Sequence, residues 1–100
     1  MKFNDVVEGV EKVSSQYCRK FNIERDNDWF LLKIQEELGE LVQCYLESAG
    51  KARSRGRSLE ELKENFQNEL VDLLCLTMAM ARFNDLELEE AIQEKWLKWL

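Results

Sequence analysis

Two pairs of carboxylates, each with members three residues apart, are the groups in this sequence best placed for chemistry. Glu37 and Glu40 form one pair, and Glu69 and Asp72 form the other. Residues three apart are neighbours on one face of a helix, and carboxylate oxygens are the ligands that Mg²⁺ prefers. If two helices bring the pairs together, the sequence predicts a magnesium site made of four carboxylates.

The setting of Asp72 strengthens this prediction. It is the only charged residue between Leu70 and Ala81. A helix that is apolar on every side is expected to be buried on every side, and an isolated buried carboxylate is destabilising unless something compensates its charge. A bound cation would do so, whereas the alternative is a buried ion pair with another helix, for which Lys33 and Lys95 are candidates.

Three other features each have two interpretations. Glu36 is a candidate for orienting a water molecule, or is a solvated surface residue. Trp29 is a candidate for stacking on a nucleobase, although a core or interface tryptophan is more common. The basic segment 51–57 is equally a polyphosphate-binding loop or a solvated connection between helices; its cations are Lys51, Arg53, Arg55 and Arg57.

The elements that would position these residues are all helices. Apolar residues recur at spacings of three and four, and the chain has no proline and only four glycines. Asp28 is the expected N-cap of the second helix, and Ser58 with Glu61 forms a capping box at the start of the third. We predict one all-α domain over residues 1–100, an antiparallel four-helix bundle, with helices at about 5–21, 28–48, 59–83 and 88–100.

Composition excludes several classes of function. The chain has a net charge of −6, which disfavours nucleic acids and membrane surfaces as partners. It has no histidine, so Ser-His and Cys-His nucleophilic pairs and histidine metal sites are excluded. The odd number of cysteines and the lack of any apolar membrane span or signal peptide favour free thiols and a cytoplasmic location; the cysteines are Cys18, Cys44 and Cys75.

The carboxylate spacing resembles a known family. Glu36-Glu37-x-x-Glu40, followed after residues 41–68 by Glu69-x-x-Asp72, is similar to the signature of MazG-like proteins in the all-α NTP pyrophosphatase superfamily. The segment from Glu89 to Lys95 also resembles the last core helix of that family. The resemblance covers about residues 29–95, and Trp99 departs from it because several relatives carry a polar residue there.

The resemblance implies a fold, an activity and a set of site residues. The fold would be a four-helix core assembled as a homodimer or homotetramer. The activity would be Mg²⁺-dependent hydrolysis of a (deoxy)nucleoside triphosphate to monophosphate and pyrophosphate, serving to cleanse the nucleotide pool, with Mn²⁺ as a substitute metal. Metal ligands would be Glu37, Glu40, Glu69 and Asp72, and Lys95 would contact phosphate. Because they lie close to these ligands in the helix, Glu36 is the candidate catalytic base, and Lys33 and Trp29 are candidate substrate contacts. The competing hypothesis is a non-catalytic helical dimerisation module.

Overall fold

A computed structural model describes all 100 residues, and its regular structure is entirely helical. The prediction of an all-α chain is therefore confirmed. No helix is both long enough and apolar enough to cross a membrane. The elements are α1 (Phe3–Lys20), α2 (Asn27–Ser48), α3 (Leu59–Phe83), α4 (Leu88–Lys95) and a short 3-10 turn, η1 (Leu97–Trp99).

The N-terminus of α2 corrects one prediction from the sequence. Asp26, and not Asp28, is the N-cap, because its side chain accepts a 2.8 Å hydrogen bond from the backbone N–H of Trp29. Asp28 lies within the first turn, where a negative charge also favours a helix. At the start of α3 the predicted capping box is confirmed: Ser58 Oγ accepts from the backbone N–H of Glu61, and Glu61 accepts from that of Ser58.

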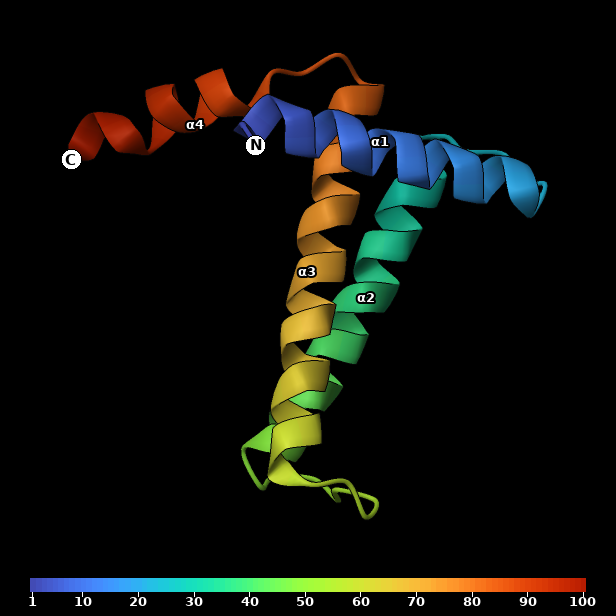
Figure 1. The fold of residues 1–100 in the computed structure, drawn as a ribbon, viewed down its shortest axis with the longest axis vertical. Helices are drawn as coiled ribbons and strands as arrows, with labels where there is room; N and C mark the ends of the chain where they lie inside the picture. The colour runs from blue at the N-terminus through green and yellow to red at the C-terminus, as the bar shows by residue number, and fades with distance from the viewer.

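The α2–α3 hairpin is the centre of the molecule. The two helices run antiparallel along most of their length, while α1 lies across the end of the hairpin that is far from the connecting loop (Figure 1). Phe30 is fully buried at this end, with its ring 5.4 Å from that of Phe83. The guanidinium of Arg25 lies over both rings, so the α1–α2 connection covers this small core.

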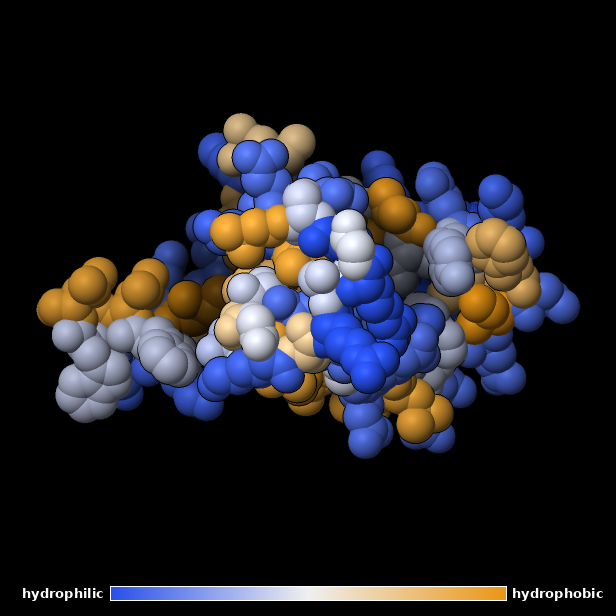
Figure 2. Space-filling model, turned by 90° about the horizontal axis from the view of Figure 1, so that it is seen from below, coloured by the Kyte–Doolittle hydropathy of each residue, from blue (hydrophilic) through white to orange (hydrophobic).

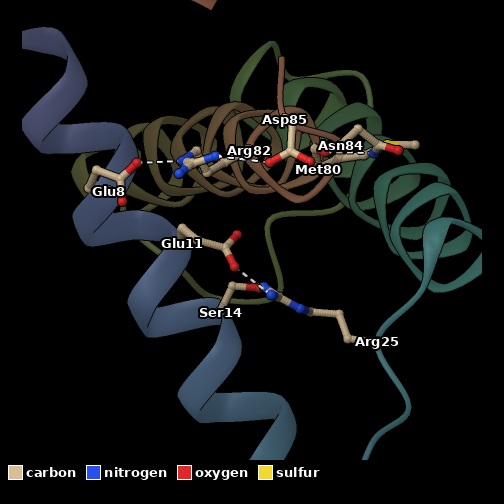
Figure 3. Close-up of polar contacts among 8 residues, drawn as sticks. All are labelled: Glu8, Glu11, Ser14, Arg25, Met80, Arg82, Asn84 and Asp85. Carbon is tan, nitrogen blue, oxygen red and sulfur yellow. Dashed lines mark hydrogen bonds and ion pairs between the residues drawn. The ribbon is translucent and has the colours of Figure 1, made fainter. Parts of the chain in front are cut away.

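Polar contacts hold α1 across the hairpin (Figure 3). Glu8 of α1 pairs with Arg82 near the end of α3. Arg25 pairs with Glu11 and donates a 3.1 Å hydrogen bond to Ser14 Oγ. The pair of Glu8 with Arg82 joins α1 to α3 across 74 positions of the sequence. The contacts of Arg25 instead attach the α1–α2 connection to α1.

The C-terminal arm, α4 with η1, differs from the predicted fourth helix. The α-helix ends at Lys95 instead of continuing to Leu100, and none of the residues in α4 or η1 is buried. The arm extends sideways from the end of the hairpin (Figure 1). Its indole and leucine side chains lie at the surface, with Trp96 at 71% and Trp99 at 79% exposure.

Helix α3 is also less buried than its composition predicts. Leu70, Val71 and Leu74 are each about half exposed in the single chain. The expectation that this segment is covered on every side is therefore wrong for one chain, since α2 and α1 together cover only part of its circumference. Only 8 of the 100 residues are buried, so a large share of the apolar side chains stays at the surface.

Candidate functional site

Three of the four predicted metal-binding carboxylates meet in the middle of the hairpin. Glu37 of α2 and Glu69 and Asp72 of α3 each place one carboxylate oxygen within 4.8 Å of the others. The antiparallel pairing of α2 with α3 produces this arrangement, because it brings the two halves of the sequence pattern to the same level. We call these three residues the acidic cluster.

Glu69 is the most perturbed member of the acidic cluster. Its Oε2 atom is buried and has no hydrogen-bond partner. Burial and the adjacent Glu37 carboxylate raise its pKa to about 7, with further contributions from the charges of Asp72 and Glu40. A half-buried carboxylate among like charges, with no ion pair to a cationic side chain, is poorly satisfied by the chain alone.

Asp72 is more accessible than the sequence predicts. Asp72 is exposed, while Glu37 and Glu69 are half-buried. The expectation that Asp72 is fully buried, and destabilising for that reason, is therefore wrong for the single chain. Partial burial of its carboxyl and the charge of Glu37 still raise its pKa, so this position favours a neutral carboxyl or a bound cation.

A groove of about 470 Å³ opens beside the acidic cluster. It lies between α1 and the hairpin, and Glu37 and Asp72 form part of its wall. Lys33 is the one cationic side chain in its lining, and Trp29 is the one indole. The remainder is contributed by Val10, Val13, Ser14, Tyr17, Cys75, Leu76 and Ala79. We call this feature the α1 groove; it joins carboxylate ligands to an aromatic and apolar surface.

Comparisons of the chain with protein-family models, with curated proteins and with solved structures find no match. The acidic cluster and the α1 groove are therefore the features of the molecule that indicate a function.

Three other predicted site residues, Glu36, Glu40 and Lys95, lie outside the acidic cluster. Glu40 is exposed and outside the cluster, although its charge contributes to the raised pKa of Glu69. Glu36 is exposed and lies 3.6 Å from Lys33 in an ion pair between neighbouring turns. Lys95 is on the exposed C-terminal arm and does not line the α1 groove.

The basic segment 51–57 lies at the loop end of the hairpin, and its last cation turns inward. Arg57 pairs with Glu47, which is 5% exposed. Gln43 donates a 3.1 Å hydrogen bond to the other oxygen of Glu47. Lys51, Arg53 and Arg55 remain exposed, so only these three cations of the segment face solvent.

The contribution of α1 to the groove was not predicted as a functional feature. Val10, Val13 and Tyr17 recur at spacings of three and four in the first helix, which is the usual sign of a core-facing surface. In the structure Val13 and Tyr17 are 66% and 48% exposed, and all three line the α1 groove. Periodicity alone could not distinguish these outcomes, because a groove wall and a core contact have the same spacing.

Proposed function

We propose that the protein is a Mg²⁺-dependent nucleotide pyrophosphatase that converts (deoxy)nucleoside triphosphates to monophosphates and pyrophosphate. The observation that carries the proposal is the acidic cluster with its unpartnered Glu69 oxygen. Two of its members, Glu37 and Asp72, form part of the wall of the α1 groove. The carboxylate spacing, which resembles that of MazG-like enzymes, supplies the reaction type.

The donor set fits a hard divalent cation. Three convergent carboxylates offer oxygen ligands only, which suits Mg²⁺ or Mn²⁺ better than a metal preferring nitrogen or sulfur. We assign Glu37, Glu69 and Asp72 as ligands and Glu40, one turn further along α2, as an additional ligand. A bound Mg²⁺ would neutralise phosphate oxygens and lower the pKa of a coordinated water.

The α1 groove supplies the surroundings that a nucleotide requires. Lys33 lies in its wall, where it would contact the anionic phosphates. Trp29 offers an aromatic surface for the nucleobase. Glu36, next to Glu37 and paired with Lys33, is assigned to orient the attacking water. Lys95 would reach phosphate only through a different placement of the C-terminal arm or from a second chain.

The proposed reaction breaks the bond between the α-phosphorus and the bridging oxygen. The oxygen of one water molecule bonds to the α-phosphorus, and pyrophosphate leaves with the bridging oxygen. The water loses its protons to solvent or to a neighbouring carboxylate. Removing unwanted nucleotides from the pool would be a suitable role for such an activity.

A second candidate function is a non-catalytic helical dimerisation module. The extensive exposed apolar surface of the hairpin and the C-terminal arm favours it. In that case the acidic cluster would have no ligand, and Glu69 would be protonated more often than an ordinary glutamate.

A panel of nucleotides assayed for pyrophosphate release separates the two functions. We expect monophosphate and pyrophosphate in the presence of Mg²⁺, resolved by phosphorus NMR, and no turnover with a chelator. Diphosphate with orthophosphate would show that a different bond is broken. An absence of turnover with every nucleotide, together with no change in melting temperature on adding Mg²⁺, would favour the dimerisation module.

A further inference from the structure

Three helices line the α1 groove, and two of them hardly touch each other. Helix α1 lines one side, α2 lines the other, and α3 lies between them. Ser14 belongs to the α1 side and Trp29 to the α2 side. Because α1 packs on α3 but has few contacts with α2, the width of the groove depends on what holds α1 at its distance from α2.

One side chain, that of Arg25 in the α1–α2 connection, links the two sides. Its guanidinium pairs with Glu11 and donates a 3.1 Å hydrogen bond to Ser14 Oγ, so it is attached to α1. The guanidinium carbon also lies 5.4 Å from the centre of the Phe30 ring of α2. That ring meets the indole of Trp29 edge-on, with 5.1 Å between the ring centres. Arg25 therefore connects Ser14 to Trp29 without lining the α1 groove itself.

The surroundings of Arg25 hold its guanidinium in one place. The side chains of Arg25 and Glu11 are only 13% and 19% exposed, so each charge depends on the other for compensation. The second oxygen of Glu11 is buried without a hydrogen-bond partner, which leaves Arg25 as the one partner of this carboxylate. The Phe83 ring of α3 lies 5.2 Å from the guanidinium carbon. A planar guanidinium can stack on rings and donate in its plane at the same time, whereas an ammonium cannot.

We propose that Arg25 is a positioning residue, which sets the separation of Ser14 and Trp29 and so fits the α1 groove to the nucleobase of the substrate. The inference rests on the proposed function, which assigns the nucleobase to the α1 groove and the phosphates to the acidic cluster. Arg25 acts only through residues on the two sides of the groove. Its loss should therefore weaken the binding of the base and leave the hydrolytic step unchanged.

Steady-state kinetics in Mg²⁺ separate this role from a general effect on folding. Arg25→Met should raise the KM for a nucleoside triphosphate about 10-fold and change kcat less than about 2-fold, because it removes binding that the ground state and transition state share. The Ki of inorganic tripolyphosphate, a competitor without a base, should stay at its wild-type value. The matched control is Arg19→Met, at an exposed arginine in the last turn of α1, which should leave KM and Ki unchanged. A Ki that rises as much as KM would overturn the proposal.

Two milder variants keep the test decisive if Arg25→Met does not fold. Arg25→Lys keeps the charge but cannot bridge Glu11, Ser14 and the rings together, and Glu11→Gln keeps the shape of its partner but not the charge. Each should raise KM in the same direction as Arg25→Met, by a smaller factor. Their effects should be less than additive in the double variant, because both act on one contact. Additive effects, or an unchanged KM in both variants, would contradict the positioning role.

A measurement that needs no turnover reports on Trp29 directly. The other tryptophans, Trp96 and Trp99, are on the C-terminal arm, which projects at the left of Figure 2, and neither lines the α1 groove. With both replaced by phenylalanine, Trp29 is the only indole. Arg25→Lys should then increase the quenching of its fluorescence by acrylamide, and Arg19→Met should not.

The fluorescence result distinguishes failure of this inference from failure of the proposed function. Unchanged quenching in Arg25→Lys overturns the positioning role, whether or not the protein hydrolyses nucleotides. Increased quenching in a protein that hydrolyses no nucleotide confirms the link between Arg25 and Trp29 but overturns the proposed function, and with it the assignment of the α1 groove to a nucleobase.

Discussion

Two glutamates of the α2–α3 hairpin are satisfied in opposite ways. Glu47, at the loop end, is buried but meets a guanidinium from Arg57 and an amide from Gln43. Glu69, in the middle of the hairpin, has a buried oxygen without a partner and three carboxylates whose charges act on it. The chain supplies a cation for Glu47 but none for Glu69, which is the reason we propose an external cation at Glu69.

The largest expected effect comes from the acidic cluster. Asp72→Asn should lower Mg²⁺-dependent pyrophosphate release at least about 100-fold, because a neutral amide holds the metal and neutralises phosphate less well. The control is Glu64→Gln, an exposed glutamate two turns earlier on α3, which should stay near wild type. Steady-state assays of both variants, with circular dichroism to verify folding, make the comparison. Equal rates in the two variants would remove the metal site from the mechanism.

A smaller effect is expected when Glu47 loses its cation. Arg57→Ala should reduce the free energy of unfolding by about 2 kcal/mol, since it leaves a buried carboxylate unpaired. Arg55→Ala, in the same loop but exposed, should change it by less than about 0.5 kcal/mol. Urea titrations measure both values. If the two variants are equally stable, Arg57 does not supply the cation that stabilises buried Glu47, and the contrast with Glu69 fails.

Removing the charge of Glu69 should instead stabilise the metal-free protein. Its folded-state pKa of about 7 lies above the ordinary value of 4.5, so the folded state binds more protons than the unfolded state between these values. Stability from this group is complete below pH 4.5 and is lost as the pH rises through about 7. Glu69→Gln should therefore raise the melting temperature at pH 8 by roughly 4 °C or more.

Varying the pH and adding Mg²⁺ provide controls for the comparison of wild type with Glu69→Gln. The melting temperatures of wild type and Glu69→Gln should converge at pH 4.5, where the wild-type carboxyl is neutral. Added Mg²⁺ should stabilise the wild type more than the variant at pH 8. A variant that is less stable than metal-free wild type at pH 8 would show that Glu69 already has a satisfactory partner.

The smallest effect is expected at Lys33, the cation in the wall of the α1 groove. Its ion pair with Glu36 is partly exposed, so Lys33→Gln should change the free energy of unfolding by less than about 0.5 kcal/mol. It should raise the KM for nucleotide more than it lowers kcat, because the lysine contacts phosphate in our proposal. A change in the pH dependence of melting would instead identify Lys33 as the counter-ion of Glu69.

The parts of the structure that depend on local sequence were predictable. Helix positions followed from apolar spacing, and the Ser58–Glu61 capping box was correctly located. The i,i+3 pairs also predicted that Glu37, Glu69 and Asp72 would converge once α2 and α3 packed side by side. Both Asp26 and Asp28 are reasonable caps by composition, so the choice between them required the backbone geometry.

Features that depend on how helices cross were not predictable. Spacing alone does not determine that Glu37 joins the acidic cluster while Glu40, three residues later, lies outside it. The position of Lys95 depends on the direction of the C-terminal arm. The apolar composition of α3 indicated what it can contact, but not whether its own chain or a second chain provides the contact.

The ion pair between Glu8 and Arg82 has a consequence for the order of folding. The two residues are 74 positions apart, whereas α2 and α3 are joined by a short loop. Closing a long segment costs more chain entropy than closing a short one, and contacts between distant residues form slowly. We therefore expect the hairpin to form first and α1 to dock afterwards. In native-state hydrogen exchange, the amides of α1 should become accessible at a lower free energy than those in the middle of α3. The α1 groove would then be the last feature to assemble and the first to be lost.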